Sequence, residues 1–313
     1  SLLRVVCGLS QPQGGAVYWQ GQPVSHVSSA REALQRELLY IGHAPGLKDD
    51  LSAAENLQFS ARFAGRPCSG EQALRMCAQK RYDFILQDYH LGDGKKNGQQ
   101  VLEDLMVDKL ISHESVFVMV TAETSQAMVL SALEHEPDAY LTKPFNRLGL
   151  AQRLDRLVQR KNLLKPIMQA LDRGKPTEVL AACAALCKQD PRFTPLCLKY
   201  RADALRDLNQ HEALEKFLNA ILADRPLPWA YAMLGRLLFK RGQVKHAQGL
   251  YETALKAFPM MPALYDGLAD VLVAQGDAKR AQSVLEEAVR LSPLAVRRQS
   301  QLGKLALANE DFE

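Results

Sequence analysis

Three polar residues, Asp88, Thr121 and Lys143, stand at or near the ends of short apolar runs in the sequence. An aspartate carboxylate can attack a phosphoryl group, a threonine hydroxyl can hydrogen-bond a phosphoryl oxygen, and a lysine ammonium group can neutralise charge. If the three side chains lie together, their types favour phosphoryl chemistry. The apolar runs that precede them are 84–86, 116–120 and 139–141.

The pattern around these runs predicts the elements that would bring the three residues together. Amphipathic helical patterns precede, separate and follow the runs, over 73–77, 101–106, 127–133 and 150–158. Continuous apolar strands between amphipathic helices indicate a parallel sheet covered on both faces. Ligands of such sheets bind at the carboxyl ends of the strands, which is where the three polar residues lie.

The segment from Ser69 to about Leu163 resembles the receiver domain of two-component response regulators. The resemblance is carried by "GEQALRMCAQKRYDFILQDYHLGDG", "VTAETS" and "AYLTKPF". It implies a flavodoxin-like α/β domain whose phosphoryl donor is a histidine kinase, a phosphotransfer protein or a small phosphodonor. It also implies a role for each site residue: Asp88 as the phosphoacceptor, Thr121 as the switch hydroxyl, Tyr140 as the switch aromatic, and Lys143 with Pro144 as the basic element.

The same resemblance implies a Mg²⁺ ion. In this family the ion is held by the phosphoacceptor, by the backbone carbonyl two residues later, here His90, and by two adjacent acidic residues after the first strand. The only adjacent acidic pair upstream is Asp49 and Asp50, and no strand-like run precedes it. The family's first strand, first helix and second strand are not recognisable. We therefore expect weak Mg²⁺ affinity and poor phosphorylation of Asp88, and no enzymatic activity beyond phosphorylation and dephosphorylation of the receiver itself.

The C-terminal part of the chain repeats with a period of 34 residues. Leu234-Gly235 recurs as Leu268-Ala269, and Gly242 recurs as Gly276. Small residues let antiparallel helices approach closely, and Gly242 and Gly276 fit the turn between paired helices. The pattern resembles the tetratricopeptide repeat. This resemblance implies an all-α superhelix that binds a partner protein or peptide.

Residues 1–67 have a different resemblance. "SLLRVVCGLSQPQGGAVYWQGQPV" and "LLYIGHAPGLKDDLSAAENLQF" are similar to the ABC-type ATPase subunit of the haem exporter in cytochrome c maturation. That resemblance implies an α/β ATPase fragment. The chain has no GxxxxGK[ST] phosphate loop and no LSxGQ signature. Without the loop that surrounds the phosphates, we expect no nucleotide-binding site.

These resemblances divide the chain into an ATPase-like fragment (1–67), a receiver-like domain (68–163) and a repeat region (164–313). Two origins are open: an artificial or mis-joined chimera, which we favour, or a natural fusion in which the first segment completes the receiver sheet. In the second case, the apolar segments at Ala16–Tyr18 and Leu38–Ile41 are candidates to pair with the strand that ends at Asp88. Three functions follow: a phosphorelay response regulator with a repeat output, an ATP-binding fragment of a haem exporter, or a scaffold without an active site.

The composition of the chain argues against several other classes of protein. Of 313 residues, 47% are hydrophobic and 24% charged, and no apolar run reaches the length of ~18 residues that spans a bilayer. The net charge of +4 is too small to predict nucleic-acid binding. The six cysteines form no CxxC pair, and Cys183 and Cys187 have the pattern of small buried apolar residues rather than zinc ligands. No secretion signal is present, so we expect a cytoplasmic protein. The chain starts at Ser1 and stops at Glu313 inside a repeat, and both ends look cut.

Overall fold

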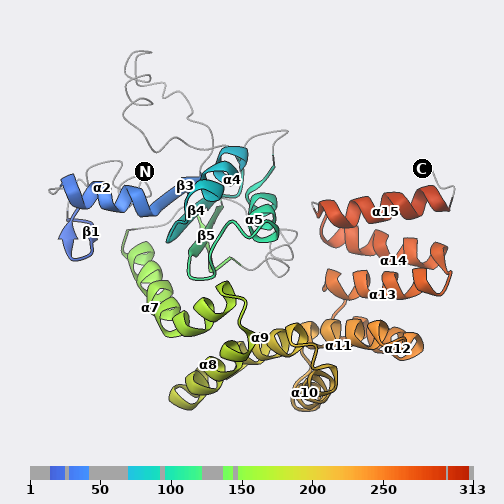
Figure 1. Ribbon diagram of the computed structural model, residues 1–313. Helices are drawn as coiled ribbons and strands as arrows, with labels where there is room; N and C mark the ends of the chain where they lie inside the picture. The colour runs from blue at the N-terminus through green and yellow to red at the C-terminus, as the bar shows by residue number, and fades with distance from the viewer. Residues whose placement is uncertain are drawn as a thin grey trace. The chain divides into compact units, whose positions relative to one another are not determined.

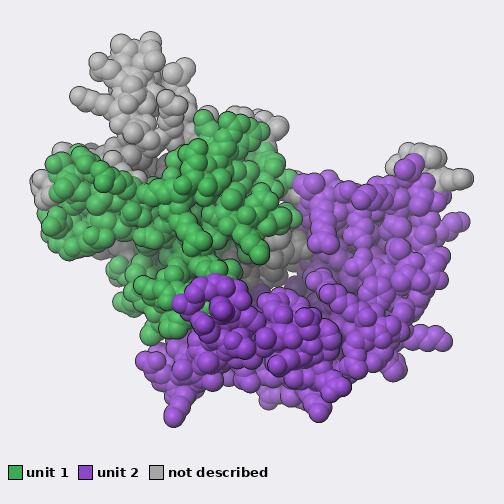
Figure 2. Space-filling model, viewed as in Figure 1, with its two compact units in different colours: residues 1–124, 135–172 green, residues 125–134, 173–313 purple. Residues whose placement is uncertain are grey.

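The computed structural model describes residues 15–24, 28–41, 70–91, 96–121, 137–143, 147–293 and 295–309. It divides into two compact units, which Figure 2 shows in two colours. Unit 1 comprises residues 1–124 and 135–172, and unit 2 comprises 125–134 and 173–313. Within the described residues, no helix is both long enough and apolar enough to cross a membrane.

Unit 1 alternates strands and helices (Figure 1). Its elements are β1 (Tyr18–Trp19), β2 (Gln22–Pro23), α2 (Ser28–Glu37), β3 (Leu38–Ile41), α4 (Gly70–Gln79), β4 (Phe84–Asp88), α5 (Gly98–Val107), β5 (Val116–Thr121), β6 (Ala139–Thr142) and α7 (Arg147–Asp172). The helix α7 continues past residue 163, where the receiver-like domain is expected to end. That domain limit stays a prediction.

The sheet of unit 1 has the strand order β3-β4-β5-β6, and every neighbouring pair is parallel. All six residues of β5 are buried, as the continuous apolar run 116–120 predicts for a strand covered on both faces. The register pairs Asp88 with Val120, and Thr121 with Thr142. The predicted parallel α/β architecture is therefore confirmed, and the three polar strand ends lie along one edge of the sheet.

The helix α7 covers one face of this sheet. Its Leu150 and Leu157 pack in one apolar cluster with Leu86, Val118 and Val120, which alternate along β4 and β5 to that face. Alternation with a period of two residues is what places these side chains on the same side. The contact fixes the first half of α7 beneath the strands that carry the candidate site.

The N-terminus of α5 lies against the other face, at the end of β4. A Cβ atom added at Gly98 would lie 2.6 Å from the backbone oxygen of Asp88 and 2.8 Å from the sulfur of Met119. No side chain fits there, so glycine is what allows the helix to begin so close to the strand. Asn97 caps the helix, accepting from the N–H of Gln100, and the Gln100 side chain accepts from the N–H of Asn97.

One of the two candidate apolar segments completes the sheet. Leu38–Ile41 forms β3, which pairs with β4 and so occupies the position beside the strand that ends at Asp88. Tyr18 lies instead in the antiparallel hairpin of β1 and β2, where Gln20 and Gly21 have positive φ angles. The hairpin still contacts the sheet, because the Trp19 and Phe84 rings meet edge to face with centroids 6.4 Å apart. The pairing of β3 is the one that the fusion account requires.

The part of unit 2 that the structure describes is helical, as the repeat resemblance implies (Figure 1). Gly242 and Gly276 have φ angles of 76° and 82° in the turns between paired helices, a conformation that favours glycine. The elements are α8 (Pro176–Gln189), η1 (Pro191–Phe193), α9 (Thr194–Asp207), α10 (His211–Asp224), α11 (Pro228–Lys240), α12 (Val244–Ala257), α13 (Pro262–Ala274), α14 (Ala278–Leu291) and α15 (Val296–Ala308).

The ring of Tyr251 on α12 sets the spacing of three helices in unit 2. It is 2% exposed, and Cβ atoms added at Gly235 on α11 or Gly267 on α13 would overlap it. Its hydroxyl donates to the backbone oxygen of Ala232 at 3.2 Å. The two glycines therefore form the cleft into which the tyrosine fits, as the small residues of the repeat pattern predict.

We predict that Gly235→Ala lowers the free energy of unfolding of unit 2 by about 1–3 kcal/mol, because the new methyl group overpacks against the Tyr251 ring. The matched control is Gly249→Ala on α12, where nothing lies within 4 Å of the added Cβ atom. That variant should gain about 0.5–1 kcal/mol from helix propensity. Urea denaturation followed by circular dichroism measures both, and equal changes in the two variants would contradict the packing argument.

Candidate functional site

Asp88 and Lys143 form an ion pair at the carboxyl edge of the sheet. Asp88 ends β4 and is only 7% exposed. Its Oδ2 lies 2.8 Å from the Nζ of Lys143, which follows β6. A carboxylate with so little access to water needs a compensating charge, and the ammonium group supplies it. The sequence-predicted acid and base are thus in direct contact.

Thr121 lies between these two residues in strand order. It ends β5 and is completely buried. The backbone oxygen of Thr121 accepts a hydrogen bond from the N–H of Lys143 at 2.7 Å. In the strand register Asp88 pairs with Val120, the residue just before Thr121. The structure therefore brings Asp88, Thr121 and Lys143 to adjacent strand ends. Pro144 lies outside the described residues.

Tyr140 is half-buried and bonded to the helix α5. Its hydroxyl donates to the Oε1 of Gln99 at 3.1 Å, and Gln99 is itself 4% exposed. Burial raises the pKa of the Tyr140 hydroxyl, and the nearby Tyr89 raises it further. The phenol therefore stays protonated and acts as a hydrogen-bond donor throughout the physiological pH range.

The described residues do not fit a Mg²⁺ site at Asp88. The strand β3 occupies the position beside β4, yet the residues that follow it in sequence are Gly42 and His43, which carry no carboxylate. Among the residues that the structure describes, no three His, Cys, Asp or Glu side chains are grouped to hold a metal ion. The candidate pair Asp49 and Asp50 lies outside them. His90 lies two residues after Asp88, with its ring edge to face against Tyr89.

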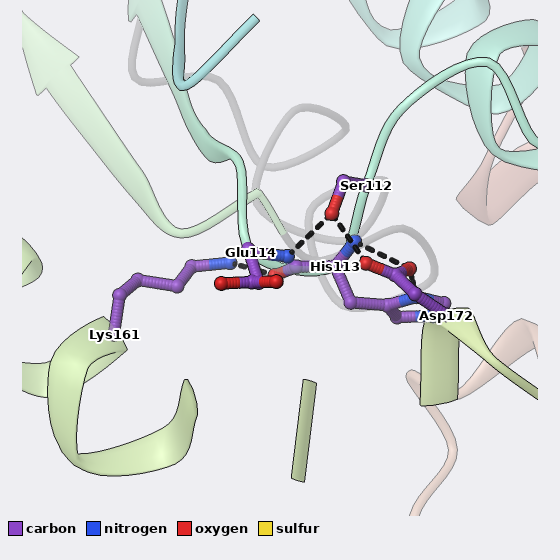
Figure 3. Close-up of polar contacts among 5 residues, drawn as sticks. All are labelled: Ser112, His113, Glu114, Lys161 and Asp172. Atoms are coloured by element: carbon purple, nitrogen blue, oxygen red, sulfur yellow. Dashed lines mark hydrogen bonds and ion pairs between the residues drawn. The ribbon is translucent and has the colours of Figure 1, made fainter. Parts of the chain in front are cut away.

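A second polar cluster, remote from the carboxyl edge, ties the loop before β5 to the end of α7 (Figure 3). The Asp172 carboxylate accepts from the Ser112 hydroxyl, from the His113 backbone N–H at 3.0 Å, and pairs with the His113 ring at 2.6 Å. On the same helix, Lys161 donates to the His113 backbone oxygen at 2.7 Å. We call Ser112, His113, Lys161 and Asp172 the α7 clamp, because these residues join the second half of that helix to the loop before β5.

Known family models match segments of both units. Residues 56–155 match the family described as response regulator receiver domain, and residues 232–296 and 267–313 match the tetratricopeptide repeat. The chain carries a receiver domain and tetratricopeptide repeats. The receiver match begins at residue 56, ahead of Ser69, where the sequence resemblance was first recognisable.

A short segment is similar to ATP-binding proteins of cytochrome c biogenesis. Over 65 residues the chain is 48% identical to the export protein CcmA of Aromatoleum aromaticum, covering 21% of this chain and 29% of that protein. Over 62 residues it is 50% identical to CcmA of Escherichia coli, covering 20% and 28%. The chain thus spans less than a third of the length of these relatives.

Solved structures similar to parts of the chain include helical and receiver proteins. MamA 41-end from Desulfovibrio magneticus RS-1 is 22% identical, covers 48% of this chain and 85% of that chain, and has a TM-score of 0.39. A tetratricopeptide protein from Thermus thermophilus is 18% identical, with 48% and 83% covered and a TM-score of 0.40. A CheY-like receiver from Methanospirillum hungatei JF-1 is 19% identical, with 40% and 94% covered and a TM-score of 0.27.

Sequence reasoning missed the partners that hold the site residues in place. Gln99 accepts the hydrogen bond from the Tyr140 hydroxyl. The sequence around it does indicate that a helix starts there, because Asn97 and Gln100 form the capping box of α5. No sequence pattern indicates the partners of Asp172, since Ser112 and Asp172 are separated by 60 residues and meet only when the loop packs on α7.

We predict that Asp172→Asn lowers the free energy of unfolding of unit 1 by about 1–3 kcal/mol at neutral pH, because a charge-assisted acceptor is lost. Burial alone would raise the pKa of Asp172, but the hydrogen bonds from His113 and Ser112 hold it below its ordinary value. With the folded pKa depressed, this stabilisation is present above the unfolded pKa and lost as pH falls through the folded one. The difference between variant and parent should therefore shrink in acid.

The control for this prediction is Asp155→Asn, an exposed residue of the same helix. Denaturation at several pH values from neutral down to about 3 measures all three proteins. A cost for Asp172→Asn that stays constant over this range would mean that the charge of Asp172 is not what holds the loop.

Proposed function

We propose that the protein is a response-regulator-like signalling adaptor in which Asp88 accepts a phosphoryl group and the repeat region binds a partner protein or peptide. The observation that carries the proposal is the contact of Asp88 with Lys143 at the carboxyl edge of the receiver sheet. This contact combines a nucleophile with a cation that can offset phosphoryl charge.

In the proposed reaction a carboxylate oxygen of Asp88 attacks the phosphorus of the donor. The bond from phosphorus to the donor, a histidine nitrogen of a kinase or phosphotransfer protein or the leaving oxygen of a small phosphodonor, breaks as the new oxygen–phosphorus bond forms. Lys143 then neutralises part of the added charge, and in this proposal the hydroxyl of Thr121, from the neighbouring strand, bonds a phosphoryl oxygen.

Receiver domains generally use Mg²⁺ for this reaction. Because the described part of this receiver offers no acidic pair beside Asp88, we expect phosphorylation to be slow and to saturate only at high Mg²⁺ concentration. Lys143 already lies against the carboxylate, so a donor must also compete with this ion pair. The proposed role is therefore that of a slowly phosphorylated adaptor in the cytoplasm rather than a rapid relay or an enzyme.

The output would be the repeat region, since tetratricopeptide repeats mediate protein interactions and the repeat matches cover residues 232–313. The alternative of a nucleotide-binding export subunit rests on a segment of about 60 residues without a phosphate loop. No contact among the described residues favours it, and it is not part of the proposal.

We predict that acetyl phosphate labels the full chain at Asp88, with a mass increase of one phosphoryl group that Asp88→Asn abolishes. The matched control is Asp83→Asn, because Asp83 is an exposed carboxylate immediately before the same strand. Intact-protein mass spectrometry after incubation with acetyl phosphate and Mg²⁺ gives the labelled fraction, and borohydride trapping locates the residue.

Two results would contradict the proposal. One is a labelled fraction that is equal in Asp88→Asn and the parent, which would place the phosphoryl group elsewhere. The other is the absence of label at any Mg²⁺ concentration in a folded sample, which would mean that Asp88 does not accept a phosphoryl group and that the protein is a scaffold without an active site. Circular dichroism of each variant shows that the sample is folded.

A further inference from the structure

Three cysteines meet at the first helical hairpin of unit 2. Cys183 and Cys187 lie four positions apart on α8, so they share one face of that helix. Cys197 lies on α9, which packs against α8, and both Cys183 and Cys187 are near enough to its thiol to affect its pKa. Sequence reasoning treated the first two as small apolar residues, and their meeting with Cys197 depends on the packing of α8 against α9.

A short connection joins the two helices that carry these thiols. The helix α8 ends at Gln189 and α9 begins at Thr194, with only η1 and Asp190 between them. The Asp190 carboxylate accepts from the N–H of Arg192 at 3.1 Å and pairs with its guanidinium group, which fixes this short turn. Cys187 therefore lies near the end of α8 and Cys197 near the start of α9, on two helices that pack against each other.

The three thiols differ in access to solvent. Cys183 and Cys197 are fully buried, whereas Cys187 is partly exposed. Burial raises the pKa of Cys183 to about 11 and raises that of Cys197 as well, so these two remain protonated thiols near neutral pH. Of the three, a soluble oxidant can reach only Cys187, and a buried thiol lies beside it to complete a disulfide.

We propose that this cluster is an oxidation site in which a peroxide oxidises Cys187 and Cys197 then joins it in a disulfide between α8 and α9. In the first step the Cys187 thiolate attacks a peroxide oxygen, the oxygen–oxygen bond breaks, and a sulfenic acid and water (or an alcohol) result. In the second step the Cys197 thiol gives up its proton as its sulfur attacks the sulfenic sulfur, and the sulfenic oxygen leaves as water with that proton. Two cysteines lose two electrons and the peroxide gains two.

Such a bond would act on the hairpin rather than within one helix. A disulfide from α8 to α9 cross-links the two helices of the first pair and restricts any change in their packing. A bond between Cys183 and Cys187 would span one turn of a single helix and constrain nothing else. The inference is independent of the receiver site, because α8 and α9 belong to unit 2.

Tryptic mapping of the full chain under non-reducing conditions tests the proposal. Cleavage after Arg173, Lys188, Arg192 and Lys199 places Cys183 and Cys187 in peptide 174–188 and Cys197 alone in peptide 193–199. After treatment with hydrogen peroxide and blocking of remaining thiols, we expect a linked pair of these peptides, with the bond assigned to Cys187 by fragmentation. The protein should run as a monomer without reductant, and dithiothreitol should release both peptides.

Single substitutions separate the roles of the thiols. In Cys187→Ala the linked pair should fall at least about tenfold, as the exposed attacking thiol is absent. In Cys197→Ala the linked pair should vanish, and a sulfenic acid on Cys187 should persist and react with dimedone. Cys183→Ala should leave the linkage in place, and the matched control Cys77→Ala, a buried cysteine of α4 in unit 1, should behave as the parent.

Other outcomes overturn the proposal. These are a bond within peptide 174–188, a linkage to Cys183 or to a cysteine outside the cluster, a linkage found only between two copies of the chain, or Cys187 recovered unmodified or as sulfinic acid alone. Circular dichroism of each variant establishes that the helices are intact, so a lost linkage reports on the thiols and not on unfolding.

Discussion

The placement of a buried carboxylate at the end of a buried strand is the constraint on which unit 1 depends. Asp88 has almost no access to water, so its charge must be balanced within the protein, and Lys143 balances it from the end of β6. This pairing is possible only if β5 lies between the two strands in parallel register, with both of its faces covered. The helices α5 and α7 provide that cover, and their own positions follow from Gly98 and from the leucines of α7.

The features that could be predicted from the sequence are those that local patterns encode. The runs that begin β4 and make up β5 are continuous and apolar, and parallel strands buried on both faces require that composition. The repeat in unit 2 was equally visible, since Gly242 and Gly276 stand where a turn needs positive φ. The strand pattern of unit 1 predicts that Asp88, Thr121 and Lys143 lie on one edge of a sheet.

The features that could not be predicted depend on contacts between distant parts of the chain. The α7 clamp joins Ser112 to Asp172, and nothing in either segment indicates the other. The thiol cluster likewise needs the packing of α9 on α8, because Cys197 is ten positions from Cys187 and separated from it by a turn. The partner strand of β4 was open for a related reason: a four-residue apolar segment such as Leu38–Ile41 is too common to identify by itself.

The strand β3 shows that the geometry of this receiver and its metal chemistry are separable. Pairing with β4 needs only backbone groups and apolar side chains, which Leu38–Ile41 supplies. Holding a divalent cation beside Asp88 needs carboxylates just beyond the strand, and Gly42 and His43 stand there in the sequence. The segment Leu38–Ile41 can thus extend the sheet without supplying the ligands. In that arrangement the ammonium group of Lys143 is the cation that the carboxylate meets, so the charge balance of the folded state is already complete within the described residues.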